Sequence, residues 1–202
     1  MKIRSIAFVF FSLAAAALYA AESPAVGSAA PDFSVPDVNG ETHSLSQYKG
    51  KYVVLEWFNP ECPFVKKHYG SGHMQKLQGE YTAKGVVWLT IDSNALGAEG
   101  NLSPEQAQKV MKEWKTKQTA LLLDPDGKAG RTYNARNTPH MFVINPEGKV
   151  IYEGAIDSKA TPNPNDISSS TNYVKVALDE SMSGKPVSNA NTRPYGCSIK
   201  YK

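Results

Sequence analysis

The two cysteines of the chain, Cys62 and Cys197, are the residues best suited to chemistry by type and position. Cys62 follows an apolar run at residues 52–58 and stands directly before Pro63 and a segment of helical pattern. Proline suits the first position of a helix, because its missing N–H would have no partner there. Unpaired N–H groups and the macrodipole at a helix N-terminus stabilise a thiolate, so that cysteine pKa values there fall to about 3.5–7.5. The position therefore predicts a reactive thiol at Cys62, with an inert buried thiol as the alternative.

Charged side chains lie on both sides of this cysteine in the sequence. Glu56 is the single interruption of the run at 52–58, and such a run is typical of a strand buried on both faces. A carboxyl group there is expected to have a raised pKa, which suits proton transfer near neutral pH. The alternative is a side chain at the strand edge that reaches water. Lys66, Lys67 and His68 add positive charge after Cys62, although a solvated helix face is the expected role of the two lysines.

The elements that must position these residues follow from hydrophobic periodicity and from turn and cap signals. Strands are expected at residues 52–58, 86–91, 120–123, 140–144 and 149–152, and helices at 63–81, from the Ser103 cap onward, at 130–135 and at 171–182. Gly70-Ser71-Gly72 predicts a break in the first helix, and Asn39-Gly40 predicts the turn of a leading hairpin. Strand–helix–strand crossovers imply parallel strands, and the late hairpin adds antiparallel ones. The expected fold is an α/β sandwich with a central mixed β-sheet flanked by helices and an N-terminal β-hairpin extension.

The composition indicates a soluble globular protein. The 202 residues are 41% hydrophobic and 20% charged, with a net charge of +3, which gives no basis for a nucleic-acid partner or a polybasic membrane patch. Residues 1–21 predict a secretory signal peptide, with Lys2 and Arg4 before an apolar stretch and small residues at its end. That stretch is shorter than the roughly 20 residues that span a bilayer. We therefore expect a secreted or periplasmic protein, free of the membrane after signal removal, in a compartment where disulfides persist.

The rest of the chain is expected to form one domain with flexible ends. Residues 22–30 are small and polar and predict a disordered linker. Residues 31–186 hold all of the expected helices and strands. Residues 187–202 form a tail without regular period that carries Cys197.

Three sequence blocks resemble the thioredoxin superfamily, in particular its peroxiredoxin-like (redoxin, or AhpC/TSA) branch. They are VVLEWFNPECPFVKKHY at 53–69, NTPHMFVINPEGKVIYEGAID at 137–157 and YGCSIKY at 195–201. The resemblance implies a thioredoxin-like three-layer sandwich over residues 31–186. It also implies that Cys62 is the nucleophile, that Glu56 accepts its proton, and that Pro139 is the cis-proline of the family. Thr138, Pro139 and Pro63 would then form the substrate-binding surface beside the thiol.

The sequence departs from the family patterns at the positions that usually assist the nucleophile. The second cysteine of a CxxC motif is replaced by Val65, and the PxxxTxxC pattern of peroxiredoxins has Leu55 and Asn59 in place of its proline and threonine. Cys197 is therefore the expected partner of Cys62, 197 − 62 = 135 residues away. Two interpretations remain open. Cys197 is either the resolving thiol of a redox pair, or half of a structural disulfide in a non-catalytic domain that binds a partner.

The function expected from the resemblance is that of an exported thiol–disulfide oxidoreductase of peroxiredoxin-like type, in redox homeostasis or antioxidant defence. Its substrate would be a disulfide or a peroxide, and a partner redox protein would supply or accept the electrons. No cofactor is implied. His140, next to Pro139, raises the question of the copper site found in some thioredoxin-fold chaperones, but the CxxxC of those proteins is missing. No metal site is expected.

Overall fold

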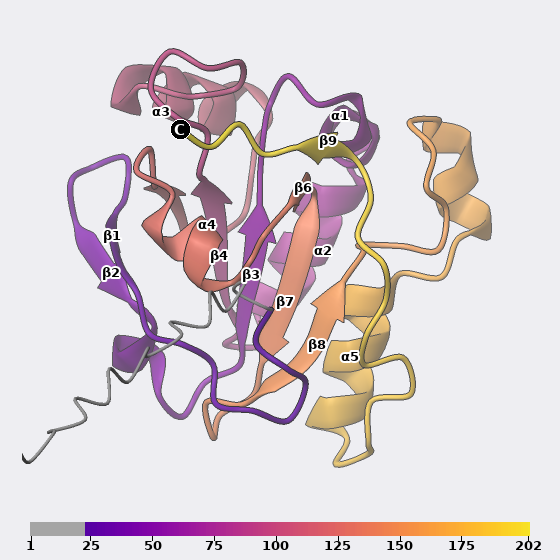
Figure 1. Cartoon of the computed structure of the whole chain (residues 1–202). Helices are drawn as coiled ribbons and strands as arrows, with labels where there is room; N and C mark the ends of the chain where they lie inside the picture. The colour runs from indigo at the N-terminus through magenta and orange to yellow at the C-terminus, as the bar shows by residue number, and fades with distance from the viewer. Residues whose placement is uncertain (1–22) are drawn as a thin grey trace, which may run out of the picture.

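The computed structural model describes residues 23–202, so the expected signal peptide at 1–21 lies outside the described residues. A five-stranded sheet in the order β5-β4-β3-β7-β8 forms its centre (Figure 1). The strands are β3 (Val53–Trp57), β4 (Val87–Asp92), β5 (Ala120–Leu123), β7 (His140–Ile144) and β8 (Val150–Gly154). β3 is parallel to β4 and β4 to β5, whereas β7 is antiparallel to both β3 and β8. This confirms the mixed sheet expected from the crossovers and the late hairpin.

Helices and a hairpin cover the two faces of the sheet, which makes a three-layer sandwich with a hydrophobic core on each face. One face packs against α1 (Pro63–Gly70), α2 (His73–Thr82), α3 (Pro104–Glu113) and α5 (Tyr173–Met182). The other packs against η1 (Leu45–Tyr48), α4 (Lys128–Thr132) and the hairpin of β1 (Ser34–Pro36) and β2 (Thr42–Ser44). Three short elements lie outside these layers: β6 (Asn137–Thr138), η2 (Pro164–Ser169) and β9 (Cys197–Ser198). None of the helices within residues 23–202 is long and apolar enough to cross a membrane.

Strand β3 supplies side chains to both cores, as its apolar run predicts. Leu55 and Trp57 pack in the core beneath α4, and Val54 packs in the core beneath α1 and α2. Successive side chains of a strand point to opposite faces of the sheet. Glu56 therefore points to the same face as Val54, toward α1 and α2.

The predicted break in the first helix is confirmed. α1 ends at Gly70 and α2 begins at His73, and Gly72 between them has a φ of 75°. This left-handed conformation costs glycine little, because it has no Cβ. The break separates α1, which carries the thiol at its start, from the longer α2.

The leading hairpin has a wider loop than the two-residue turn that Asn39-Gly40 predicts. Residues 37–41 separate β1 from β2. The carboxylate of Asp37 accepts hydrogen bonds from the backbone N–H groups of Asn39 at 2.8 Å and Glu41 at 2.9 Å. These bonds close a five-residue loop, which the Asn39-Gly40 dipeptide does not predict.

Residues 27–30 correct the expectation of a disordered linker at 22–30. The N–H of Gly27 donates to the carbonyl of Val150 at 2.7 Å, and residues 28–30 continue this pairing along the edge of the sheet. An edge strand presents unpaired backbone groups, and these residues satisfy part of that edge at β8. Their small and polar composition gave no sign of this contact.

The tail at residues 187–202 is folded onto the domain. Figure 1 shows its last part passing over the end of the sheet near the start of α1, with β9 beside β6. β9 pairs antiparallel with β6, and Ile199 is buried in the core beneath α4. The N–H of Lys200 donates to the side chain of Asn94 at 3.0 Å. On the other side of Cys197, the side chain of Asn137 donates to the carbonyl of Gly196 at 3.0 Å, so the tail contacts the domain both before and after this cysteine.

Candidate thiol site

Cys62 is the N-cap of α1, as its place before Pro63 predicts. Its backbone is extended (φ −69°, ψ 122°), and its carbonyl accepts the N–H of Lys66 at 2.9 Å. Pro63 follows at the first position of the helix and is exposed. The sulfur itself is not exposed: Cys62 has 0% of its surface accessible, and its thiol donates to the carbonyl of Thr138 at 3.1 Å.

Cys197 reaches the same place from the other end of the chain. In the antiparallel pairing of β6 with β9, Thr138 lies opposite Cys197. The Thr138 hydroxyl donates to the Cys197 carbonyl at 3.4 Å. Thr138 therefore contacts Cys62 through its carbonyl and Cys197 through its hydroxyl. Both cysteines are present as free thiols.

The surroundings of the two thiols make Cys62 a stronger acid than Cys197. Burial raises the pKa of Cys62, but the side chains of Cys197 and Thr138 and the backbone of Cys197 and Val65 together bring it below its ordinary value. Burial raises the pKa of Cys197 to about 12, and its hydrogen bond to Cys62 acts in the same direction. When one proton leaves the pair, the thiolate therefore forms on Cys62. A depressed pKa is typical of an attacking cysteine.

The peptide bond between Thr138 and Pro139 is cis, as the resemblance implies. Gly196 approaches this segment so closely that a Cβ on it would stand 2.1 Å from the carbonyl oxygen of Thr138 and 3.5 Å from Cβ of Phe64. The φ of Gly196 is +113°, a region that L side chains rarely adopt. Only glycine fits this position between Thr138 and the first turn of α1.

Glu56 is fully buried and is bound by side chains from three elements. It accepts hydrogen bonds from Tyr69 at 2.9 Å, Gln78 at 3.3 Å, Trp88 at 2.8 Å and Thr90 at 3.3 Å. Burial raises its pKa to about 7, against the lowering effect of these four donors. The raised pKa agrees with the expectation from the apolar run. No hydrogen bond within residues 23–202 joins Glu56 to either cysteine, so its role as proton acceptor of Cys62 stays a prediction.

The pKa of Glu56 leads to a test by pH. Because it lies above the ordinary 4.5, the folded protein binds this proton more tightly than the unfolded chain does. That contribution to stability is fully present below about pH 4.5 and is lost as the pH rises through about 7. Glu56→Gln has no such proton. When the pH is raised from 5 to 8, the decrease in its unfolding free energy should therefore be smaller than the decrease in the wild type, by on the order of 3 kcal/mol. Urea unfolding at both pH values measures this difference.

Glutamine resembles the protonated acid in shape, so Glu56→Gln is expected to fold. A Glu61→Gln variant, at an exposed position next to Cys62, is the control and should keep the pH dependence of the wild type. Equal pH dependence for Glu56→Gln and the wild type would contradict the raised pKa.

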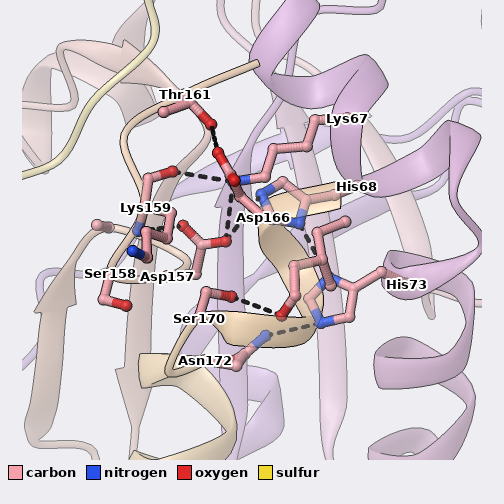
Figure 2. Close-up of polar contacts among 12 residues, drawn as sticks. Lys67, His68, His73, Asp157, Ser158, Lys159, Thr161, Asp166, Ser170 and Asn172 are labelled. Carbon is pink, nitrogen blue, oxygen red and sulfur yellow. Dashed lines mark hydrogen bonds and ion pairs between the residues drawn. The ribbon is translucent and has the colours of Figure 1, made fainter. Parts of the chain in front are cut away.

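The sequence predicts that Lys66 and Lys67 lie on a solvated helix face, and this is wrong for Lys67. Lys67 and His68 are buried, and only Lys66 is exposed. The ammonium of Lys67 lies 3.0 Å from the carboxylate of Asp157, in a polar cluster between α1 and the loop after β8 (Figure 2). Burial lowers the pKa of His68 to about 3, so this side chain is neutral and adds no charge near Cys62.

Sequence reasoning missed Asp157 and Tyr195 as members of this cluster. The Tyr195 hydroxyl donates to Asp157. No spacing in the sequence points to this pair, because 195 − 157 = 38 residues separate them. His140, in β7, is buried, and its ring packs against Trp57 of β3 and Phe142 of β7.

Residues 26–153 match the AhpC/TSA family, which is more than half of the chain. The chain belongs to the AhpC/TSA family. This AhpC/TSA chain therefore has the redoxin-type thioredoxin fold that its sequence blocks and its mixed sheet indicate. The matched residues hold Glu56, Cys62, Thr138 and Pro139. Cys197 lies in the part of the chain beyond the match.

Among curated proteins, this AhpC/TSA chain is similar to thiol-disulfide oxidoreductase ResA of Bacillus subtilis (strain 168), with 30% identity over 130 residues. The aligned residues cover 64% of this chain and 67% of that protein. Among solved structures, an uncharacterized conserved protein from Geobacillus kaustophilus is similar with a TM-score of 0.78 and 29% identity, over 88% of this chain and 93% of that one. A hypothetical protein from Sinorhizobium meliloti 1021 has the same fold, with a TM-score of 0.78 and 24% identity over 90% and 97% of the two chains.

Proposed function

We propose that this protein is a thiol–disulfide oxidoreductase in which Cys62 attacks and Cys197 resolves. The observation that carries the proposal is that both cysteines meet at Thr138, at the N-terminus of α1: the Cys62 thiol donates to the Thr138 carbonyl, and Cys197, from 135 residues away, lies opposite Thr138 in the β6–β9 pairing. The likeness to a curated thiol-disulfide oxidoreductase supports the same reaction class.

The first step uses the stronger acid of the pair. The Cys62 thiolate attacks one sulfur of a substrate disulfide, a new S–S bond forms between Cys62 and that sulfur, and the original S–S bond breaks. The second sulfur of the substrate leaves as a thiolate and takes up a proton. The N-terminal N–H groups of α1 and the thiol of Cys197 stabilise the Cys62 thiolate before the attack.

The second step uses Cys197. Its thiol passes its proton to the leaving group, and its sulfur attacks the sulfur of Cys62 in the mixed disulfide. The Cys62–Cys197 disulfide forms and the substrate leaves with two electrons and two protons gained in total. A dithiol partner protein then reduces the Cys62–Cys197 disulfide in the same two steps, with the roles of protein and partner exchanged.

Access to Cys62 requires a movement of the tail. Cys62 has no exposed surface, and Gly196 lies against both Thr138 and Phe64 beside it. The pairing that covers this place is short, because β6 and β9 have two residues each. We propose that β9 leaves β6 to admit a substrate and returns to resolve the mixed disulfide.

Family membership extends the proposal to a hydroperoxide as the electron acceptor. The Cys62 thiolate would then attack the peroxide, release an alcohol or water, and become a sulfenic acid that Cys197 converts to the same disulfide with loss of water. The proposal includes an antioxidant role, which hydrogen peroxide consumption by the reduced protein tests. It also includes action outside the cytoplasm, which the signal-peptide pattern of residues 1–21 supports.

A redox titration of the purified protein tests the function against a purely structural disulfide. The protein is equilibrated in thiol–disulfide buffers, quenched by alkylation, and the state of Cys62 and Cys197 is read by mass spectrometry. A redox-active pair is expected to have a potential between about −270 and −120 mV. A potential below about −300 mV would identify a structural disulfide and contradict the proposal.

A further inference from the structure

A fully buried ion pair lies next to the thiol site without contacting either cysteine. The side chains of Lys67 and Asp157 are both 0% exposed, and Nζ of Lys67 lies 3.0 Å from Oδ2 of Asp157. The same ammonium donates to the carbonyl of Lys159 at 2.9 Å, whose own N–H donates to Oδ1 of Asp157 at 3.0 Å (Figure 2). Removing two charges from water is costly, and apolar side chains often replace such a pair without loss of stability. Stability alone therefore does not account for this ion pair.

The histidines of this cluster do not share the charge of Asp157. Nε2 of His68 is 3.8 Å from Oδ2 of Asp157 and has no hydrogen-bond partner among the described residues. Nδ1 of His68 instead lies 2.9 Å from Nδ1 of His73, and His73 contacts Asn172 through its other nitrogen. Lys67 is the cation that holds Asp157 in place as a carboxylate.

This carboxylate binds the tail through one side chain. The Tyr195 hydroxyl donates to Oδ1 of Asp157. The Tyr195 ring packs against Phe64, with ring centroids 5.7 Å apart, and lies 5.8 Å from the ammonium of Lys67. Phe64 and Lys67 belong to α1, the helix that begins at Cys62. Tyr195 is therefore bound to the same helix that carries the attacking thiol.

Tyr195 stands two residues before Cys197, just outside β9, and the chain bends between them at Gly196, whose φ is +113°. Within β9, a shift of register by one residue would reverse the face of every side chain. β9 pairs with β6 over only two residues, so its backbone bonds specify the register weakly. A hydrogen bond from Tyr195 to a fixed carboxylate removes this freedom and keeps Cys197 facing the start of α1.

We propose that Asp157, held by Lys67, is a positioning residue for the resolving step: it binds Tyr195 and so sets the register in which Cys197 meets Cys62. The inference rests on the proposed function, because it assigns a role in closing the Cys62–Cys197 disulfide. Asp157 acts through Tyr195 and touches no reacting atom.

Tyr195→Phe tests this role, because it removes the hydroxyl and keeps the ring against Phe64. The measured quantity is the equilibrium constant for closure, the reaction in which Cys197 displaces glutathione from its mixed disulfide with Cys62 and the Cys62–Cys197 disulfide forms. A hydrogen bond to a charged group is strong enough that its loss should lower this constant roughly ten- to hundredfold. The rate of mixed-disulfide formation at Cys62, measured in a Cys197→Ser background, should not fall when Tyr195→Phe is added.

Controls separate positioning from general destabilisation. Tyr52→Phe removes a hydroxyl that lies 3.1 Å from the hydroxyl of Ser181 in α5 and, among the described residues, has no hydrogen bond to Asp157 or Tyr195, and it should leave the equilibrium constant unchanged. Asp157→Asn is the second variant and keeps an oxygen for Tyr195 without the charge, so a smaller loss than for Tyr195→Phe is expected. Circular dichroism verifies that each variant is folded before it is compared.

The outcomes distinguish this inference from the proposed function. If the wild type forms the disulfide reversibly but Tyr195→Phe has the same equilibrium constant within about twofold, the positioning role is wrong and the function stands. If Tyr195→Phe slows mixed-disulfide formation as much as it weakens closure, the role of Tyr195 is structural and the inference is equally overturned. If the wild type shows no reversible disulfide, the proposed function itself has failed.

Discussion

Cys62→Ser is expected to reduce disulfide exchange with a small disulfide substrate, such as glutathione disulfide, by at least about a thousandfold, to the rate without protein. The physical reason is that the thiolate is the nucleophile and serine at this position has no comparable acidity. Cys62 is also the only cysteine at a helix N-terminus in the described chain, and the pKa of Cys197 is raised to about 12. Cys197 should therefore not replace it.

Cys197→Ser is expected to give a different result. The first step remains possible, so one equivalent of substrate thiol is released and a stable mixed disulfide accumulates on Cys62. Mass spectrometry detects this adduct, and a turnover assay should show that the reaction stops after this first equivalent because the second step is missing. Ser198→Ala, at the exposed neighbouring position in β9, is the matched control and should turn over like the wild type.

Two results would contradict this division of roles. One is a mixed disulfide on Cys197 in the Cys62→Ser protein that forms as fast as the adduct of the wild type. The other is full turnover of Cys197→Ser without a trapped adduct, which would require a resolving thiol from the partner instead of the tail.

Gly196→Ala is expected to displace the tail from the thiol site. The added Cβ would stand 2.1 Å from the Thr138 carbonyl oxygen, a backbone atom that cannot turn aside, and the φ of +113° is strained for alanine. A left-handed backbone conformation alone costs a residue with a Cβ about 1–2 kcal/mol, which corresponds to roughly a five- to thirtyfold change in an equilibrium. The clash adds to this cost. The β6–β9 pairing should therefore be largely lost.

This displacement has two measurable effects. The buried Cys62 becomes accessible, so iodoacetamide should alkylate it at least about fivefold faster in the reduced variant than in the wild type. The Cys62–Cys197 disulfide becomes easier to reduce by glutathione by a similar factor, because its closed geometry is no longer favoured. Both effects arise from the same loss of docking and should appear together.

Gly148→Ala provides the control for backbone strain. Gly148 also has a positive φ, +77°, but a Cβ there would meet nothing within 4 Å, and the residue lies in the turn between β7 and β8. This variant should be slightly less stable and leave the alkylation rate of Cys62 unchanged. Equal alkylation of Cys62 in Gly196→Ala and the wild type would show that the tail does not restrict access to the thiol.

The sequence alone determined the features that depend on neighbouring residues. The apolar run at 52–58 indicated a buried central strand, Pro63 placed Cys62 at the start of a helix, and the glycines at 70 and 72 marked its break. These features follow from local periodicity and from the backbone preferences of proline and glycine, which act over a few residues. The fold class and the position of the candidate nucleophile could therefore be predicted without coordinates.

Only the tertiary structure decided which distant groups meet, and with what charge. It placed Cys197 opposite Thr138 and beside Cys62, and it buried Lys67 against Asp157 where a solvated lysine was expected. Whether a charged side chain is solvated or paired depends on what packs over it, and that partner can come from any part of the chain. Contacts between residues far apart in sequence arise when the layers of the sandwich pack together, so no local pattern encodes them. The ion pair of Lys67 with Asp157 and its contact with Tyr195 belong to this second group, whereas Cys197 was already expected as the partner of Cys62 because the sequence has only these two cysteines.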